Sequence, residues 1–500
     1  MSRINTNVPS QIARRNLSEN NKGLNTTLER LSTGLRINRG KDDPAGLIAS
    51  ENLRAEKSSL TAAIANAERA DQFANIAEGG LSEISNLLTD LRGLVTASAN
   101  TSGISSEEKS ANQLQIDSIL QTVDRLSEAT NFQGIKLLNG NQDFTAGNIN
   151  AGVSDYRVNA AKLNFGASQS VTATVATSAQ RGTVRLDLNV SNGIVTTGNQ
   201  LFTIEIGGAS GSREFSFGNG TSVAQAVSAI NAFKDVIGVS ATASGTSAIN
   251  LKSTDFGSDQ FVSTRVVNLA GVSGANIIQA AATNENNYTG TSVAVAASAL
   301  VRDDGQDIAG SVNGLVATGR GRTLKVATDF LDSEITLTAS KAQTAGTFTA
   351  FNITGGGASF QLDSKINLGT KTTLGIQNVA ARKLGNSTLG FLSDLATGKD
   401  KNVVNGDLGA AAKIVEEAIK QLSGLRGRLG AFQKNVVGST IRNLGISLEN
   451  SAAAESVIRD ADFASETANL TRGQILTQAG GQSLGLANSA PQAALSLLRS

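Results

Sequence analysis

The chain has 500 residues and a formal net charge of +1, and it contains no Cys, no His and no Trp. The absence of Cys and His excludes thiol chemistry, imidazole base catalysis, Ser-His-Asp triads and ordinary zinc sites. Neither the charge nor any apolar run indicates nucleic-acid binding or a membrane span, and because the start has no secretory signal, composition alone would indicate a cytoplasmic protein.

An amphipathic helix is predicted within residues 1–35. Its leucines recur at steps of seven, four, three and four, at Leu17, Leu24, Leu28, Leu31 and Leu35. This spacing places them on one helical face. The apolar area available here is too small to offset the entropy of ordering the segment. We therefore expect it to fold only against partners, in its own chain or in others.

A charged turn is expected next, because Gly34, Gly40 and Pro44 interrupt the helical pattern. Its charges are Arg36, Arg39, Lys41, Asp42 and Asp43. Asp43 before Pro44 has the pattern of an N-cap followed by proline at the first helical position. A solvated loop between two helices is the simplest interpretation.

A long helix is predicted from about Pro44 to about Asn100. Apolar residues recur from Leu60 to Val95 at alternating steps of three and four, which is typical of a coiled-coil seam. The first half of the seam is mainly Ala, and the second half holds Leu81, Ile84, Leu88 and Leu91. Such a helix far exceeds the mean of about 11–12 residues and needs a partner of similar length.

A third helix is expected from Ser105 or Ser106 to about Ala129, with one apolar stripe made of Ile116, Ile119, Val123 and Leu126. Gly134 and Asn139-Gly140 then indicate a β-hairpin within residues 130–141.

The composition changes from about 142 to 400, where Ser, Thr, Gly, Ala and Val dominate. Alternating apolar residues predict half-buried strands, for example at Phe202, Ile204 and Ile206, and one helix is expected near Val223–Ile230. The run VRDDGQD, which holds Asp303, Asp304 and Asp307, is interpreted as a solvated turn, with a weak Ca²⁺ loop or carboxylate-only catalysis as alternatives.

The helical register returns after about Gly406, with Leu422, Leu425, Leu429, Phe432 and Val436. The first four are predicted to pack against the seam Leu81, Ile84, Leu88 and Leu91. A last amphipathic stretch, Ala461 to Arg499, mirrors the apolar first 35 residues and holds Leu484, Leu495 and Leu498.

The predicted fold is therefore multidomain. A long α-helical coiled-coil core is built from both chain ends and carries a β-rich, α+β central insertion. The expected limits are an outer helix at 1–40, the first half of the core at 41–175, the insertion at 176–355, the second half of the core at 356–455 and a second outer helix at 456–500.

Four stretches resemble bacterial flagellin. They are LERLSTGLRINRGKDDPAGLIASENLR at residues 28–54, NFQGIKLLNG at 131–140, SVIRDADFASETANLTRGQILTQAG at 456–480 and ANSAPQAALSLLRS at 487–500. The resemblance covers about residues 1–140 and 400–500, with a shorter match at 355–385, and the middle follows the family only loosely.

The resemblance implies a structural subunit that is exported unfolded by the flagellar type III system and polymerises into a secreted helical filament, a homo-oligomer that serves swimming motility. It also implies that the terminal helices form a coiled coil lining a central channel, and that an export chaperone, a cap and junction proteins are partners. The residues expected in this assembly coiled coil are Leu17, Leu24, Leu28, Leu31, Leu35, Leu484, Leu495 and Leu498. It implies neither an enzyme nor a cofactor or metal, and neither nucleic acid nor membrane insertion.

The resemblance further implies roles for two sets of residues. The cluster Arg36, Arg39, Lys41, Asp42 and Asp43 would join the outer and inner tubes by charged contacts. The animal Toll-like receptor that senses flagellin would face Asp90, Leu94 and Gln115. At these positions the family has Arg, Leu and Glu, so weak detection is expected.

Two alternatives remain, and a third is excluded. A hook–filament junction protein is similar at both ends, although APQAALSLLRS matches flagellin more closely. A metalloprotease insertion is excluded, because it needs an HExxH motif and the chain has no His. The insertion could instead act as an adhesin or sugar-binding surface, for which the sequence names no ligand.

Overall fold

The computed structural model describes residues 6–100, 103–164, 166–188, 194, 200–270, 272, 275–281, 284–296 and 300–497, with side chains as far as residue 490. The chain divides into two compact units. The first holds Met1–Asp71, Gln361–Thr370 and Phe432–Ser500, and the second holds Gln72–Phe360 and Lys371–Ala431.

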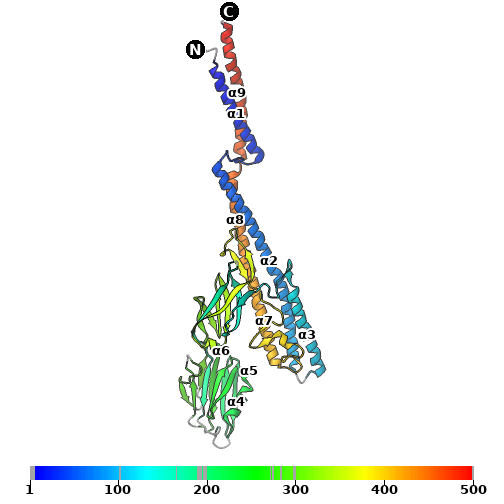
Figure 1. Cartoon of the computed structure of the whole chain (residues 1–500), viewed down its shortest axis with the longest axis vertical. Coiled ribbons are helices and arrows are strands. Elements are labelled where there is room, and N and C mark those ends of the chain that lie inside the picture. The colour runs from blue at the N-terminus through cyan, green and yellow to red at the C-terminus, as the bar shows by residue number, and fades with distance from the viewer. Residues whose placement is uncertain are drawn as a thin grey trace. The chain divides into compact units, whose positions relative to one another are not determined.

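In the first unit, α1 (Val8–Thr33) and α9 (Phe463–Leu497) lie side by side and antiparallel (Figure 1). The helix α1 ends at Gly34, which adopts the left-handed conformation (φ 72°) and donates its backbone N–H to the carbonyl of Arg30. Leu35 therefore lies beyond the helix, bridged to Asp460. The prediction that Leu35 continues the helical stripe was wrong, because the glycine cap ends the helix first.

The face of α1 toward α9 differs from the predicted stripe. Its half-buried or buried positions are Ser10, Ala13, Leu17, Asn20, Leu24, Thr27 and Leu31. Thr27, not Leu28, occupies the step after Leu24, and Leu28 is 46% exposed. The leucine pattern mixed two faces, because three- and four-residue steps are both compatible with a helix and only the partner selects between them.

The helix α2 (Pro44–Ser98) begins where predicted, with the Asp43 Oδ1 atom accepting the Gly46 backbone N–H at 2.9 Å. Its N-terminal part packs against α8 (Gly438–Arg459) through Leu60, Ala63 and Leu444. Lys57–Glu455 at 2.8 Å and Arg459–Glu51 at 3.1 Å flank this small core. The ion pairs run in opposite directions along the two helices, so the pair is antiparallel.

A π-helical turn, Phe432–Val437, precedes α8. A π turn uses i→i+5 hydrogen bonds and so holds one residue more than the α-helix would. Phe432 is buried as predicted, but the next buried residue is Val437, with no exposed area, while Val436 is only half-buried. The prediction of Val436 was wrong because the extra residue shifts the register by one.

The helices of the second unit are the C-terminal part of α2, α3 (Ser106–Ala129) and α7 (Leu408–Ala431). Ser105 caps α3 by accepting the Glu108 N–H at 3.1 Å. Along α3 the buried positions are Gln113, Ile116, Leu120, Val123 and Ser127. Ile119 and Leu126 are only half-buried, so the predicted α3 stripe was correct at two of its four positions.

A short hairpin, β1 (Asn131–Phe132) and β2 (Ile135–Lys136), follows α3. Its turn is Gln133-Gly134, where both residues have positive φ, 51° and 83°. This favours a type I′ turn. Asn139-Gly140, the other predicted turn signal, lies beyond the hairpin.

A single eight-stranded antiparallel sheet forms the first β region, in the order β3-β19-β5-β15-β16-β17-β18-β4. Its strands are β3 (Phe144–Gly147), β4 (Val153–Ala161), β5 (Gln169–Thr177), β15 (Ala309–Val312), β16 (Leu315–Arg320), β17 (Thr323–Ala327), β18 (Leu331–Leu337) and β19 (Gly346–Gly356). One apolar core, which includes Val171, Ile335 and Phe351, covers one face. The predicted insertion limits, 175/176 and 355/356, fall inside β5 and β19.

A second β region lies in sequence between β5 and β15. Its two sheets share one apolar core, which includes Phe202, Ile249 and Val262. They are ordered β13-β12-β6-β10-β9 and β14-β11-β7-β8. The elements are β6 (Thr183–Asp187), β7 (Phe202–Gly208), β8 (Gly211–Phe217), α4 (Val223–Asn231), α5 (Lys234–Ile237), β9 (Val239–Ser244), β10 (Ala248–Ser253), β11 (Phe261–Asn268), β12 (Asn276–Gln279), β13 (Ser292–Ala294) and β14 (Leu300–Asp304).

Several short elements lie outside these sheets. They are α6 (Ala339–Ala342), β20 (Ala358–Gln361), β21 (Lys371–Leu374), β22 (Gly385–Asn386), β23 (Gly390–Phe391) and the 3₁₀ turn Leu392–Leu395. The helical core with a β-rich, α+β middle was therefore predicted correctly.

Candidate functional site

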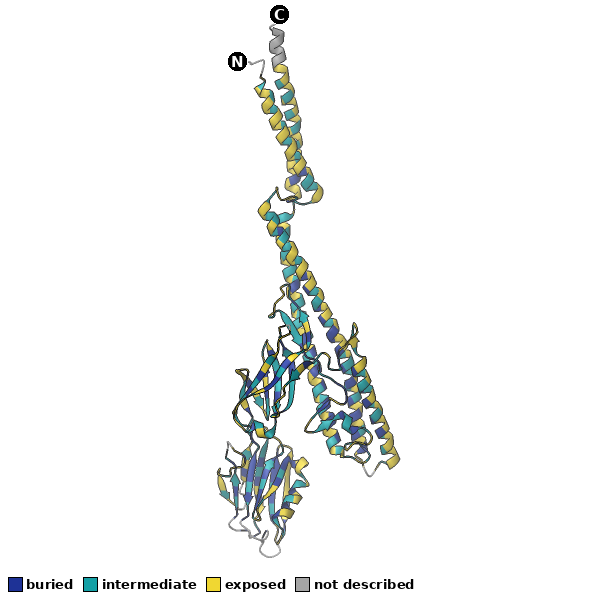
Figure 2. Ribbon diagram, in the orientation of Figure 1, coloured by how far each residue is buried: buried dark blue, intermediate teal, exposed yellow. Residues whose placement is uncertain are grey.

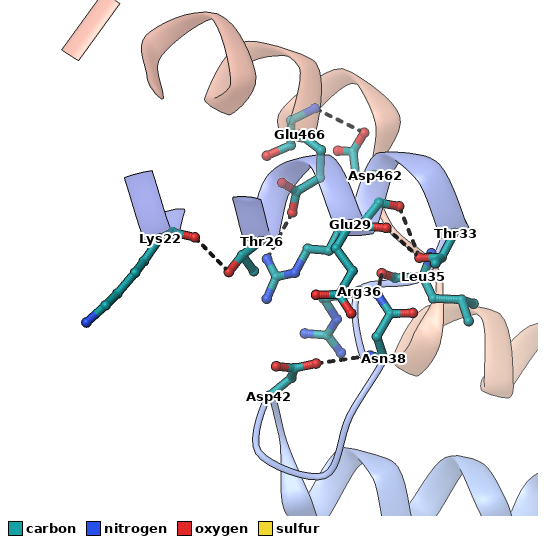
Figure 3. Close-up of polar contacts among 12 residues, drawn as sticks. Lys22, Thr26, Glu29, Thr33, Leu35, Arg36, Asn38, Asp42, Asp462 and Glu466 are labelled. Atoms are coloured by element: carbon teal, nitrogen blue, oxygen red, sulfur yellow. Dashed lines mark hydrogen bonds and ion pairs between the residues drawn. The ribbon is translucent and has the colours of Figure 1, made fainter. Parts of the chain in front are cut away.

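The predicted charge cluster occupies the loop between α1 and α2 (Figure 3). The Arg36 guanidinium donates from Nε and Nη2 to the carbonyl of Ile458, at 3.2 and 2.5 Å, and the Arg36 backbone N–H donates to the carbonyl of Arg459 at 2.7 Å. Arg39 pairs with Glu29 at 2.8 Å. The two arginines therefore tie this loop to the ends of α8 and α1.

The two aspartates of the cluster stabilise the backbone of their own loop. Asp42 Oδ2 accepts the backbone N–H groups of Arg39 at 2.8 Å and Asn38 at 3.2 Å. These hydrogen bonds hold the pKa of Asp42 below its usual value. The hydrogen bond from Arg39 has the largest effect. Asp43 caps α2, and Lys41 is exposed. Contacts of this cluster with a second subunit stay a prediction.

Two leucines of α1 pack against two glycines of α9. A Cβ atom on Gly473 would lie 3.3 Å from Cδ1 of Leu24, and one on Gly480 would lie 3.3 Å from Cδ1 of Leu17. The two glycines are seven residues apart in sequence, and so are the two leucines, which is the heptad spacing of a coiled coil. The glycines let the two helices approach closely. The contact buries little apolar area, since Thr27 is the only buried residue of α1. In Figure 2 the described parts of α1 and α9 are coloured mainly as exposed and half-buried.

Several apolar side chains of this helix pair are left exposed. Of the predicted coiled-coil residues, Leu17, Leu24, Leu31 and Leu484 are half-buried on the α1–α9 contact, and Leu28 is exposed. Leu498 lies outside the described residues, and so does the side chain of Leu495. The exposed apolar side chains of the pair also include Val8, Ile12, Ile475, Leu476 and Leu486.

All residues of the predicted core seam are buried: Leu81, Ile84, Leu88, Leu91, Leu422, Leu425, Leu429 and Phe432. Arg426 of α7 pairs with Glu78 of α2 at 2.7 Å, which sets the level of the two helices. At about 1.5 Å per residue in antiparallel helices, Leu81 falls level with Leu422. This supports that contact, whereas the pairing of the whole seam stays a prediction.

Asp90, Leu94 and Gln115, the predicted receptor-facing residues, line one groove of about 570 Å³ between α2 and α3. Its other lining residues are Thr89, Gly93, Ser118 and Ile119. Asp90 and Gln115 are exposed, and Leu94 is half-buried. Residues far apart in sequence thus form a small apolar floor with a polar rim.

The sequence reasoning missed Gln113, a buried glutamine of α3. Its Nε2 atom donates to the carbonyl of Leu395 at 2.9 Å, and its Oε1 atom accepts the Val403 backbone N–H at 2.9 Å. The side chain therefore fixes the segment that leads into α7. Its position three residues before Ile116 was the available signal, because it puts a polar residue on the buried stripe.

The prediction that the acidic run 303–307 is a solvated turn was wrong, because Asp303 lies in β14 and both Asp303 and Asp307 are half-buried. Asp303 Oδ2 accepts the Thr183 N–H at 2.6 Å, and burial raises the pKa of Asp303 to about 6. Asp307 accepts the Gly321 N–H at 2.6 Å. Both carboxylates therefore accept backbone hydrogen bonds within their own chain, Asp303 from the first residue of β6 and Asp307 from the turn between β16 and β17. Only Asp304, paired with Arg302 at 2.7 Å, is exposed.

The part of the chain that the structure describes contains no group of three or more Asp and Glu side chains placed to hold a metal ion. Within the same residues, no helix is both long and apolar enough to cross a bilayer.

Comparison with known proteins identifies both ends of the chain. Residues 4–143 match the bacterial flagellin N-terminal helical region, residues 412–498 match the bacterial flagellin C-terminal helical region, and residues 202–255 match the flagellin hook IN motif. The chain is 31% identical to a flagellin of Salmonella typhimurium and 30% identical to the B-type flagellin of Pseudomonas aeruginosa, in each case over 99% of both proteins.

These full-length matches are to filament proteins, so they do not favour the hook–filament junction alternative. They agree with a structure in which α1, α9 and the α2–α8 pair are helical and the middle is β-rich. The chain belongs to the bacterial flagellin family and is a structural subunit of the flagellar filament.

Proposed function

We propose that this subunit leaves the cell as an unfolded chain through the flagellar type III apparatus and completes its fold only in the extracellular filament. The observation that carries the proposal is the α1–α9 pair. In its contact Leu17 and Leu24 lie against Gly480 and Gly473, and Thr27 is the only buried residue of α1, so the contact buries little area. Exposed apolar residues such as Ile475 and Leu486 remain on the same helices.

Other copies of the chain supply the missing cover. In a helical polymer, the exposed apolar residues of one α1–α9 pair face the next pair, and the terminal helices together form the coiled coil around the central channel. The predicted limits, with outer helices at 1–40 and 456–500, fit this arrangement. The loop cluster Arg36–Asp43 then joins the outer helices to the core helices within a subunit and contacts neighbouring subunits.

The expected partners are an export chaperone, the cap and the junction proteins of the flagellum. Zero Cys suits an unfolded transit because no disulfide can form on the way. The role is structural, without catalysis. Weak detection by the Toll-like receptor that senses flagellin also belongs to this proposal, because the groove has Asp90 where the family has Arg.

Backbone amide exchange on monomer and filament tests the proposal. We expect rapid exchange along α1 and α9 in the monomer, protection of the same amides in the filament, and protection of α2, α3 and α7 in both. Strong protection of α1 and α9 in the monomer would contradict it.

Seeded polymerisation provides the matched mutational test. The double variant Ile475→Ser, Leu486→Ser removes apolar side chains from the exposed face of α9, and we expect it to stop elongation on added seeds. Val316→Ser is the control, since Val316 is 90% exposed in the β region and the substitution is of the same kind. Equal elongation of both variants would show that the α9 face is not used.

A further inference from the structure

The loop 361–370 is held by internal hydrogen bonds and exposes one isoleucine to solvent. Gln361 Nε2 donates to the carbonyl of Lys365 at 2.8 Å and to Thr370 Oγ1 at 3.0 Å. The Thr370 hydroxyl donates to the same Lys365 carbonyl at 2.7 Å, and its backbone N–H donates to Asn367 Oδ1 at 2.9 Å. Ile366, at the tip of this loop, is 85% exposed.

The pre-ordering of this loop matters for binding. A side chain held by a hydrogen-bonded loop loses less conformational entropy when it docks than one on a flexible segment. Single exposed apolar residues are common and need no explanation. Ile366 differs from such residues because hydrogen bonds among Gln361, Lys365, Asn367 and Thr370 hold the loop that carries it.

The groove between α2 and α3 could hold the exposed side chain of Ile366, here called the knob. Leu94 and Ile119 form its apolar floor, and it is open, with a volume of about 570 Å³. Both are half-buried in the single chain. An isoleucine side chain seated there would cover them.

The charges beside the two features are complementary. Lys365, exposed, directly precedes Ile366 in the loop. Asp90, also exposed, lies on the rim of the groove, one helical turn from Leu94. An ion pair between Lys365 and Asp90 would orient the knob and exclude the opposite seating.

We infer that Ile366 of one subunit docks into the Leu94–Ile119 groove of a second copy of this chain, with Lys365 against Asp90. The knob and the groove are different surfaces, so the contact is heterologous and leaves a free knob at one end and a free groove at the other. A contact of this type propagates into an open helical polymer and does not close into a dimer. The inference rests on the filament function and specifies one contact of it.

Disulfide trapping tests the contact on the full chain, which has no native Cys to interfere. One population carries Ile366→Cys and the other Gln115→Cys, at the groove rim. The two are copolymerised, oxidised and separated on a non-reducing gel. We expect a band of double mass from the filament and none from the same mixture kept monomeric.

The control mixture pairs Ile366→Cys with Val316→Cys, which is exposed but lies outside the groove. No double-mass band from the groove mixture, or one no stronger than in this control, would overturn the inference. If the unmodified chain itself formed no filaments on seeding, the filament function would fail instead, so the two failures are distinguishable.

Charge reversal supplies a second test that needs no cysteine. Lys365→Glu and Asp90→Lys should each raise the critical concentration for elongation about two- to fivefold, as expected for a partly exposed ion pair. The double variant should return it close to the unmodified value. Additive worsening in the double variant would overturn the pairing.

Discussion

Arg30 of α1 donates from Nη1 to Oε1 of Glu466 of α9 at 3.0 Å, and the Glu466 side chain is only 8% exposed. The pair joins the last turn of α1 to the first turn of α9. A carboxylate this deeply placed needs its cation, because a buried charge without a partner is costly.

Arg30→Met should therefore weaken the filament more than it weakens the monomer. The substitution leaves Glu466 buried and unpaired, a change that typically costs about 3–5 kcal/mol. We expect the dissociation temperature of the filament to fall by several degrees, measured by light scattering on heating. Arg15→Met, on an exposed position of α1, is the control and should have little effect. Equal effects of the two would show that the ion pair is unimportant.

Leu88→Ala and Leu425→Ala should each destabilise the core of the second unit by about 2–5 kcal/mol, through lost transfer free energy and a residual cavity. Leu88 has no exposed area and Leu425 is 2% exposed. Thermal unfolding of the full-length monomer would measure this. Leu114→Ala, at a residue that is 69% exposed, should change the melting temperature little. Unchanged melting in both core variants would refute the predicted seam.

Asp303 should make the β region less stable at neutral than at mildly acidic pH. Burial raises its pKa to about 6 from 3.8, so the folded state favours the protonated form. This contribution therefore increases the free energy of unfolding as the pH falls through 6 towards 4, and it is lost as the pH rises through 6.

Asp303→Asn isolates this contribution, because the amide oxygen can still accept the Thr183 N–H. We expect the variant to melt higher than the unmodified chain at pH 8 and the difference to shrink at pH 4.5. A difference that does not depend on pH would exclude Asp303 as the titrating group.

Lys41→Glu tests whether the loop cluster contacts a neighbouring subunit. Reversing Asp42 and Asp43 would be a poor test, since both carboxylates hold the backbone of their own loop. Lys41 is exposed, and among the described residues no ion pair of its side chain is seen. We expect the monomer to melt normally and the critical concentration for elongation to rise about two- to fivefold. Unchanged elongation would assign the cluster to the subunit interior.

The groove residues lead to a prediction about the receptor. The double variant Asp90→Arg, Gln115→Glu should restore strong signalling in a reporter-cell assay with monomeric protein. The guanidinium can donate several hydrogen bonds where the carboxylate can only accept them. A variant with only Thr89→Ser serves as a control on the same groove. Potent signalling by the unmodified monomer, equal to that of the double variant, would refute this prediction.

Local patterns of the sequence determined where α2 and α3 begin and that α2 is long. The Asp43 N-cap, the unbroken three- and four-residue steps of α2 and the Ser105 cap of α3 all depend on neighbours in the chain, so they could be predicted without a partner. The same holds for the alternating residues Phe202, Ile204 and Ile206 of β7. The stretches at both ends that resemble flagellin were sufficient to predict the family and the filament role.

Only the tertiary structure decided which faces are buried and which surfaces form. Thr27 and not Leu28 faces α9, because the glycines Gly473 and Gly480 select one of two faces that the leucine pattern allows. The π turn moves burial to Val437, because an extra residue in the helix has no signal in a three- and four-residue pattern. The groove of Leu94 and Ile119 exists because α2 and α3 pack together, and the position of a packed partner is not encoded in the local sequence of either helix.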